Sequence, residues 1–113
     1  MVFTASIENG VTILCLPERL DGSNASQAEA ELPEILSQGL PLVLDARSLT
    51  YISSAGLRLL LVAAKRLAHQ GRPVVIAAMA EHLVDIMRMT GFDHMFAFVP
   101  DMDGAHHLAL GGG

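Results

Sequence analysis

Three short, mostly apolar runs, separated by segments with helical spacing, most constrain how this 113-residue chain can fold. They are Val11–Leu16, Pro41–Asp45 and Pro73–Ala78, and their apolar residues would occupy both faces of a strand. Strands of that kind lie inside a sheet, and strands joined by helices run parallel through right-handed crossovers. The sequence therefore predicts an α/β fold with a parallel sheet covered by helices.

The N-terminus predicts one further strand. Phe3, Ala5 and Ile7 alternate with polar residues until Asn9-Gly10, a dipeptide that supplies the positive φ angles of a tight hairpin. Val11–Leu16 would fold back on this strand. The expected architecture is a small mixed sheet, an N-terminal antiparallel hairpin plus parallel strands, with helices packed against it.

Three segments have the apolar spacing of amphipathic helices. The first runs roughly from residue 24 to 38, although Pro33 inside it would kink or restart the helix. The second begins at Ser54 and places one apolar stripe toward the core, formed by Leu57, Leu60, Leu61, Ala64, Leu67 and Ala68. The third is Glu81–Thr90. A glycine that can end a helix follows each segment: Gly39, Gly71 and Gly91.

The C-terminal part predicts a weaker last strand, Met95–Val99, and one short helix within Asp101–Leu110. Residues 111–113 are all glycine and are expected to form a flexible tail. There is no internal repeat and no linker long enough to divide the chain. We therefore expect residues 1–110 to form one domain, in which the 51% apolar composition supplies the core.

Charge and composition exclude several classes of partner. A net charge of −5 argues against nucleic acid and anionic membrane surfaces as partners. No apolar stretch approaches the roughly 20 residues of a membrane helix, and the N-terminus lacks signal-peptide features. The only cysteine, Cys15, lies in an apolar run, which suits a buried thiol in a reducing compartment. A cytoplasmic location is expected.

The segment from residue 42 to 57 carries the strongest functional signal. A strand ending at Asp45 is followed by a polar turn and then by Ser53 and Ser54 at the start of a predicted helix. A helix start has unpaired N–H groups and partial positive charge, so it accommodates an anion. The pattern indicates phosphorylation control more than catalysis. The alternative interpretation of Ser54 is an ordinary helix N-cap.

These residues also carry a resemblance. A strand ending in Asp45, a short loop, and Ser53-Ser54-Ala55-Gly56-Leu57 running into an Arg/Leu-rich helix resemble the STAS domain family, and within it the stand-alone bacterial anti-sigma factor antagonists. In that family the serine two residues before the glycine is the phosphoacceptor, which here is Ser54. Members often have an acidic residue before the phosphoserine. This chain has Ser53 there, which makes Ser53 a second, less favoured candidate.

The resemblance implies a regulatory binding module. In that family the unmodified antagonist binds an anti-sigma factor with a histidine-kinase-like ATPase domain and frees a sigma factor for transcription. The anti-sigma factor phosphorylates the antagonist with ATP, and a serine phosphatase restores it. STAS domains also resemble accessory or scaffold subunits of lipid-transport ABC systems and signalling complexes, in which the serine would be a plain cap.

The resemblance further implies a partner-binding surface around the two loops, formed by Asp21, Ser23, Asp45, Ser53, Ser54, Gly56, Leu57 and Arg58. Each of the better-marked positions has a structural alternative. Asp45 would hydrogen-bond the loop amides, which we favour, or orient the serine. Gly56 would simply permit close packing, and Asp21 and Ser23 would be helix caps.

Signals for enzyme chemistry are weak. The five histidines lack metal-ligand spacing, and no nucleophile elbow or nucleotide-binding loop is present, so no metal or other cofactor is expected. The weakest alternative is a phosphoacceptor aspartate, Asp45, as in response regulators. Those proteins need an acidic cluster for Mg²⁺ at the strand ends, and here only Asp45 ends a parallel strand. The chain is therefore interpreted as a binding protein, not an enzyme.

Overall fold

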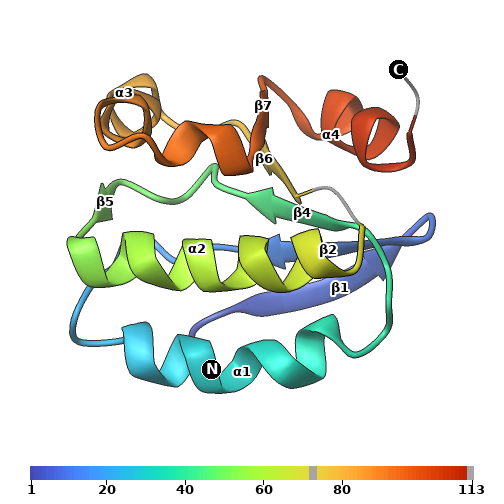
Figure 1. Ribbon diagram of the computed structural model, residues 1–113, viewed down its shortest axis with the longest axis horizontal. Coiled ribbons are helices and arrows are strands. Elements are labelled where there is room, and N and C mark those ends of the chain that lie inside the picture. Colours follow the sequence, from blue (N-terminus) through green and yellow to red (C-terminus); the bar gives the residue numbers. More distant parts are fainter. Residues whose placement is uncertain (72–73, 112–113) are drawn as a thin grey trace.

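A computed structural model describes residues 1–71 and 74–111 of the chain. Its main sheet has five strands in the order β1-β2-β4-β6-β7 (Figure 1), namely β1 Thr4–Glu8, β2 Val11–Cys15, β4 Leu42–Asp45, β6 Val74–Ala77 and β7 Ala97–Val99. Only the β1–β2 pair is antiparallel, and the other three pairs are parallel. The predicted mixed α/β sheet is confirmed. Pro73, expected to start the third apolar strand, lies outside the described residues.

The hairpin forms at the predicted dipeptide, where Asn9 and Gly10 have φ angles of 53° and 78°. β2 lies between β1 and β4, as its two apolar faces require. All five residues of β1 are exposed, although its apolar and polar residues alternate. Phe3, just before β1, is buried. The alternation therefore marks a strand at the sheet edge that is not covered by a helix.

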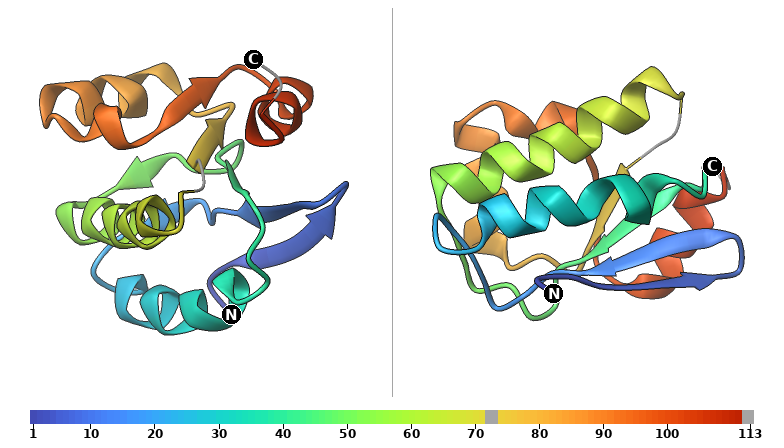
Figure 2. Two further views of the ribbon diagram at one scale, coloured as in Figure 1. Left: turned by 45° about the vertical axis from the view of Figure 1, so that its right-hand side comes forward. Right: turned by 90° about the horizontal axis from the view of Figure 1, so that it is seen from below.

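Within the described part of the chain, four α-helices cover the sheet unequally (Figure 2). α1 Ala25–Leu36, α2 Ser54–His69 and α3 Glu81–Met89 lie on one face, whereas α4 Met102–Ala109 lies alone on the other. A short 3₁₀ turn, η1 Phe92–Met95, precedes β7. Even-numbered residues of β2, β4 and β6 point to the first face and odd-numbered ones to the second. The core is thus two separate apolar layers.

Pro33 neither ends nor restarts α1, which continues to Leu36. Both Pro33 and Glu29, whose carbonyl loses its usual partner, are exposed. Water can therefore satisfy the carbonyl that the proline ring leaves unpaired, which makes the interruption tolerable.

The buried stripe of α2 is rotated from the predicted one. Leu57, Leu60, Ala64 and Leu67 are buried as expected, but Ala68 is exposed and Leu61 only half-buried. The buried face extends instead to Gly56, Leu59 and Ala63. α2 contacts α1 and η1 as well as the sheet region, so its apolar face is broader than one stripe.

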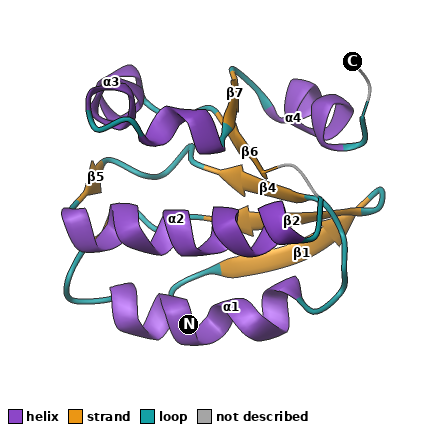
Figure 3. Ribbon diagram, in the orientation of Figure 1, coloured by secondary structure: helices purple, strands orange, loops and turns teal. Residues whose placement is uncertain are grey.

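A second, unpredicted sheet consists of two parallel strands of two residues each, β3 Arg19–Leu20 and β5 Tyr51–Ile52. Figure 3 shows β5 just before the start of α2. Leu20 and Ile52 are buried, whereas Arg19 and Tyr51 face outward. The guanidinium carbon of Arg19 lies 4.3 Å from the centre of the Tyr51 ring. This small sheet fastens the β2–α1 connection to the segment that leads into α2.

Three further sequence expectations concern a membrane-spanning helix, the C-terminal glycines and Cys15. Among the described residues, none of the helices has the length and apolar character needed to span a membrane. Gly111 forms a turn after α4, with φ 82°, and the rest of the expected flexible tail, residues 112–113, lies outside the described residues. Cys15 is half-buried, so the expectation of a buried side chain is corrected.

Candidate functional site

The carboxyl ends of β2, β4 and β6 lie at one edge of the main sheet, and hydrogen bonds continue beyond the strands there. The N–H of Leu16 donates to the carbonyl of Asp45 at 3.0 Å, and the N–H of Ala46 donates to Ala77 at 3.0 Å. The loops after β2 and β4 therefore leave the sheet side by side. We refer to residues 16–24 and 45–58 together as the loop edge.

Ser54 is the first residue of α2, and it is exposed. The N-cap is Ser53, which is extended and whose Oγ accepts from the N–H of Gly56 at 3.3 Å. The N-cap interpretation of Ser54 is therefore wrong. Within the part of the chain that the structure describes, the hydroxyl of Ser54 makes no hydrogen bond, so it remains available for reaction.

The start of α2 is electrostatically suited to an anion. The helix is 16 residues long and has no acidic residue in its first turn. The aligned peptide dipoles place about +0.5 charge at such a terminus, and an anion there is stabilised by about 0.3–1 kcal/mol. A negative group attached to Ser54 would thus be tolerated by the helix.

Gly56 is required by close packing. A Cβ at this position would overlap the carbonyl oxygen of Leu20 and lie 2.7 Å from Cγ1 of Ile52. Real Cβ atoms do not approach neighbours this closely, so any side chain here would push β3 and β5 away from α2. This geometry supports the packing interpretation of Gly56.

Asp45 orders its own loop. It is only 4% exposed, and its carboxylate accepts hydrogen bonds from the Arg47 N–H at 3.1 Å and from Arg47 Nη2 at 2.6 Å. These hydrogen bonds hold the pKa of Asp45 below its ordinary value although burial opposes the shift. The thiol of Cys15 donates to the same carboxylate at 3.6 Å, and burial followed by the Asp45 charge raises the pKa of Cys15. The carboxylate of Asp45 thus binds Arg47 and Cys15, and among the described residues it makes no hydrogen bond to Ser54.

Asp21 and Ser23 form a turn before α1 and do not cap it, so the capping alternative is wrong. The N-cap of α1 is Asn24. The carboxylate of Asp21 accepts from the Ser23 N–H at 2.9 Å and from its hydroxyl at 2.5 Å, and it is 3.5 Å from Arg19. The hydrogen bond from the Ser23 hydroxyl is the main reason that the pKa of Asp21 is lowered.

The structure brings all eight predicted residues to the loop edge but does not expose all of them. Ser23, Ser54 and Arg58 are exposed, and Asp21 and Ser53 are half-buried. The other three are buried in the isolated chain: Asp45, Gly56 and Leu57. Their contact with a partner stays a prediction.

Two contacts at the loop edge escaped the sequence analysis. Nε2 of His82, at the start of α3, lies 3.2 Å from the carbonyl oxygen of Thr50, so α3 also braces the loop before β5. Arg58 lines a narrow cleft of about 130 Å³ between the starts of α1 and α2, together with Gly22 and Glu29. Neither contact has a sequence signal, because each joins segments far apart in the chain.

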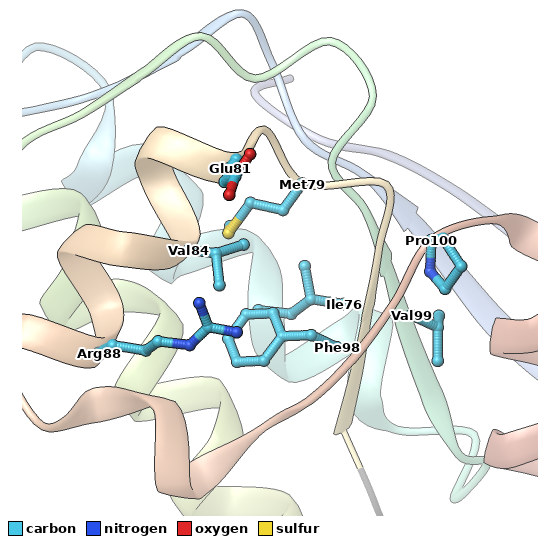
Figure 4. Close-up of a pocket in the computed structure, with 8 residues that line it drawn as sticks. All are labelled: Ile76, Met79, Glu81, Val84, Arg88, Phe98, Val99 and Pro100. Atoms are coloured by element: carbon cyan, nitrogen blue, oxygen red, sulfur yellow. The ribbon is translucent and has the colours of Figure 1, made fainter.

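A separate hollow of about 280 Å³ lies between α3 and β7 (Figure 4). Its floor is apolar, with Ile76 and Phe98, and Arg88 extends across it from α3. None of the eight predicted residues lines it. In residues 1–71 and 74–111 there is also no cluster of three or more potential metal ligands.

Comparison with known proteins identifies the family. Residues 3–105 match the STAS domain. The chain is 34% identical over 106 residues to a protein of Bordetella bronchiseptica named "Putative anti-sigma factor antagonist BtrV", covering 93% of this chain and 91% of that protein. The chain belongs to the STAS domain family, on the branch of the stand-alone anti-sigma factor antagonists.

Solved structures share the fold at low sequence identity. An anti-sigma-factor antagonist (STAS) domain protein from Planctomyces limnophilus has a TM-score of 0.87 and 16% identity, covering 96% of this chain and 97% of that one. The antagonist SpoIIAA in its unphosphorylated form has a TM-score of 0.74 and 13% identity, covering 97% and 98%. The phosphorylated form of Bacillus SpoIIAA has a TM-score of 0.71 and 14% identity, covering 94% and 98%.

Proposed function

We propose that this chain is a cytoplasmic anti-sigma factor antagonist that is switched by phosphorylation of Ser54. The unphosphorylated form binds an anti-sigma factor with a histidine-kinase-like ATPase domain and thereby releases a sigma factor. The proposal rests on the family and on one observation above all: the exposed hydroxyl of Ser54 makes no hydrogen bond among the described residues and begins a helix with no acid in its first turn.

The proposed switch acts through charge and leaves the fold intact. A phosphate adds about −1.5 to −2 charge at pH 7. The start of α2 tolerates that charge, whereas a partner surface fitted to an uncharged serine would have to desolvate it or repel it. Ser53 is less suited as the acceptor, because its Oγ already serves the N–H of Gly56 and its side chain is half-buried.

In the proposed transfer, Oγ of Ser54 bonds to the γ-phosphorus of ATP as the bond to the ADP oxygen breaks. The hydroxyl proton passes to a base on the kinase. ATP and the base belong to the anti-sigma factor, so this chain acts as a substrate and binding protein and not as an enzyme. A serine phosphatase then hydrolyses the phosphoserine and restores binding.

The test is incubation of the full chain with ATP and a histidine-kinase-like ATPase from the same cell, followed by intact mass measurement and mapping of the modified residue. We expect one added phosphate on Ser54 and none on Ser54→Ala. A phosphate mapped to Ser53, or modification of Ser54→Ala, would overturn the assignment. Copurification with a permease and its ATPase, without phosphorylation, would instead favour the accessory-subunit role.

A further inference from the structure

β1 is an edge strand whose outer side is unpaired by any other described strand. The N–H groups of Thr12 and Leu16 donate to Pro41 and Asp45, so the even-numbered residues around β2 direct their backbone groups to β4. The backbone groups of the odd-numbered residues of β2 therefore point to β1, where they form hydrogen bonds with Thr4, Ser6 and Glu8. The backbone groups of the two intervening residues, Ala5 and Ile7, point away from the sheet, so β1 presents a free template for another strand.

A groove of about 630 Å³ runs along this edge, between β1 and α1. Ile7 is 53% exposed, and Ile35 and Ala30 of α1 form the opposite apolar wall. Figure 2 shows β1 at the outer margin of the sheet with α1 beside it. The side chains of alternate residues on an added strand could therefore enter an apolar channel.

The charged side chains that line the groove are all acidic, and the N-terminal ammonium of Met1, which also lines it, acts on Glu31. These side chains are Glu31 and Glu34, and no lysine or arginine is among the described residues that line the groove. Glu31 is already engaged, because its carboxylate accepts from the N–H groups of Val2 and Phe3 at 2.7 and 3.0 Å. That contact protects the backbone before β1 and confines the free edge to Ala5–Ile7. Glu34 remains exposed and makes no side-chain ion pair within the described chain.

We propose that the β1 edge is a docking surface for an extended, basic peptide segment of a partner protein. The segment adds a strand beside β1, places apolar side chains in the groove and sets a lysine or arginine against Glu34. A second copy fits less well, because two acidic rims would face each other and so short an edge buries far less than the roughly 1,200 Å² of a stable interface. The groove contains no loop-edge residue, so this inference does not rest on the proposed function.

The test is selection of a randomised nine-residue phage-displayed peptide library on the full chain, with counter-selection on Ile7→Pro. The proline removes an outward N–H while sparing the β1–β2 hydrogen bonds, and proline is tolerated on edge strands. We expect enriched peptides that alternate apolar residues with lysine or arginine. Their binding should slow amide hydrogen exchange at Ala5 and Ile7 and fall at least tenfold in Glu34→Lys. Glu81→Lys, which makes the same charge change far from the groove, should bind normally.

Several results would overturn the proposal. They are the absence of enrichment against Ile7→Pro, enrichment of acidic peptides, or equal binding by wild type and Glu34→Lys. A concentration-dependent dimer in sedimentation that Ile7→Pro abolishes would assign the edge to a second copy and also overturn it. If Ile7→Pro shows a lowered urea midpoint, Ala5→Pro and the Glu34→Lys comparison replace it as the deciding variants.

Discussion

The N–H of Ser53 donates a 3.0 Å hydrogen bond to the carbonyl of Leu20, although the two residues belong to different loops. This bond continues the β3–β5 pairing and sets the turn of Asp21 and Ser23 next to the start of α2. A partner that approaches Ser54 therefore meets both loops as one ordered surface. Little ordering entropy remains to be lost when the surface is bound.

Ser54 is predicted to control capture of the anti-sigma factor through its charge. Ser54→Asp should weaken binding at least tenfold, because a carboxylate at the first residue of α2 would be buried against the partner. Ser54→Ala should bind within about twofold of wild type. Isothermal titration calorimetry with the purified anti-sigma factor measures both. Equal affinities for wild type and Ser54→Asp would remove the charge switch.

Gly56 is predicted to be intolerant of any side chain. Gly56→Ala should lower the free energy of unfolding by about 1–3 kcal/mol, because its Cβ would overlap the Leu20 carbonyl oxygen. Gly22→Ala is the matched control, since nothing lies within 4 Å of a Cβ there. Its free energy of unfolding should stay within about 0.5 kcal/mol of wild type. Urea titration of both variants decides, and similar midpoints would contradict the packing role.

Substitutions of Ser53 and of Ser54 are predicted to differ in their effect on the stability of the protein. Ser53→Ala removes the N-cap of α2, which typically costs about 0.5–2 kcal/mol, and the long 3.3 Å bond places the effect near the lower end. Ser54→Ala removes an exposed hydroxyl and should be nearly neutral. Thermal unfolding of the two single variants makes the comparison. A larger loss for Ser54→Ala would reverse the cap assignment.

The stability of the β4–α2 loop is predicted to depend on pH through Asp45. The pKa of Asp45 is lowered by Arg47 from an ordinary value of 3.8, so the folded state binds this proton less tightly than the unfolded state. The contribution is therefore fully present above about pH 4 to 5 and is lost as the pH falls through the folded pKa. Urea midpoints at pH 7, 5, 4 and 3 should fall more steeply for wild type than for Asp45→Asn. If the urea midpoints of wild type and Asp45→Asn fall equally with pH, Asp45 is not the source of the pH dependence.

Much of the fold follows from local patterns. The apolar runs give β2, β4 and β6, and Asn9-Gly10 gives the hairpin because only residues that tolerate positive φ form so tight a turn. The two-residue strands β3 and β5 have no such signal, because two residues are too few to show any period. The position of the buried face of α2 also depends on neighbouring helices, which sequence spacing does not reveal.

The candidate site was predictable in location but not in exposure. The spacing of Asp45, Ser54 and Gly56 places them at the carboxyl end of a strand and the start of a helix, where the structure has them. Which of them reach solvent depends on the Arg47 side chain and on the approach of Leu20. These contacts form only in three dimensions, so the burial of Asp45 and Gly56 could not be read from the sequence, whereas the burial of Leu57 follows from its apolar spacing.

Among the described helices, α4 is the only one that covers its face of the sheet. It covers a layer of aliphatic side chains made of Val11, Ile13, Val43, Val75 and Ala77, through its own Ala105 and Ala109. No other described helix could replace it there, because α1, α2 and α3 are committed to the opposite face. Removing this eight-residue helix would expose a contiguous apolar surface that favours aggregation, so resistance to aggregation depends on a segment remote from Ser54.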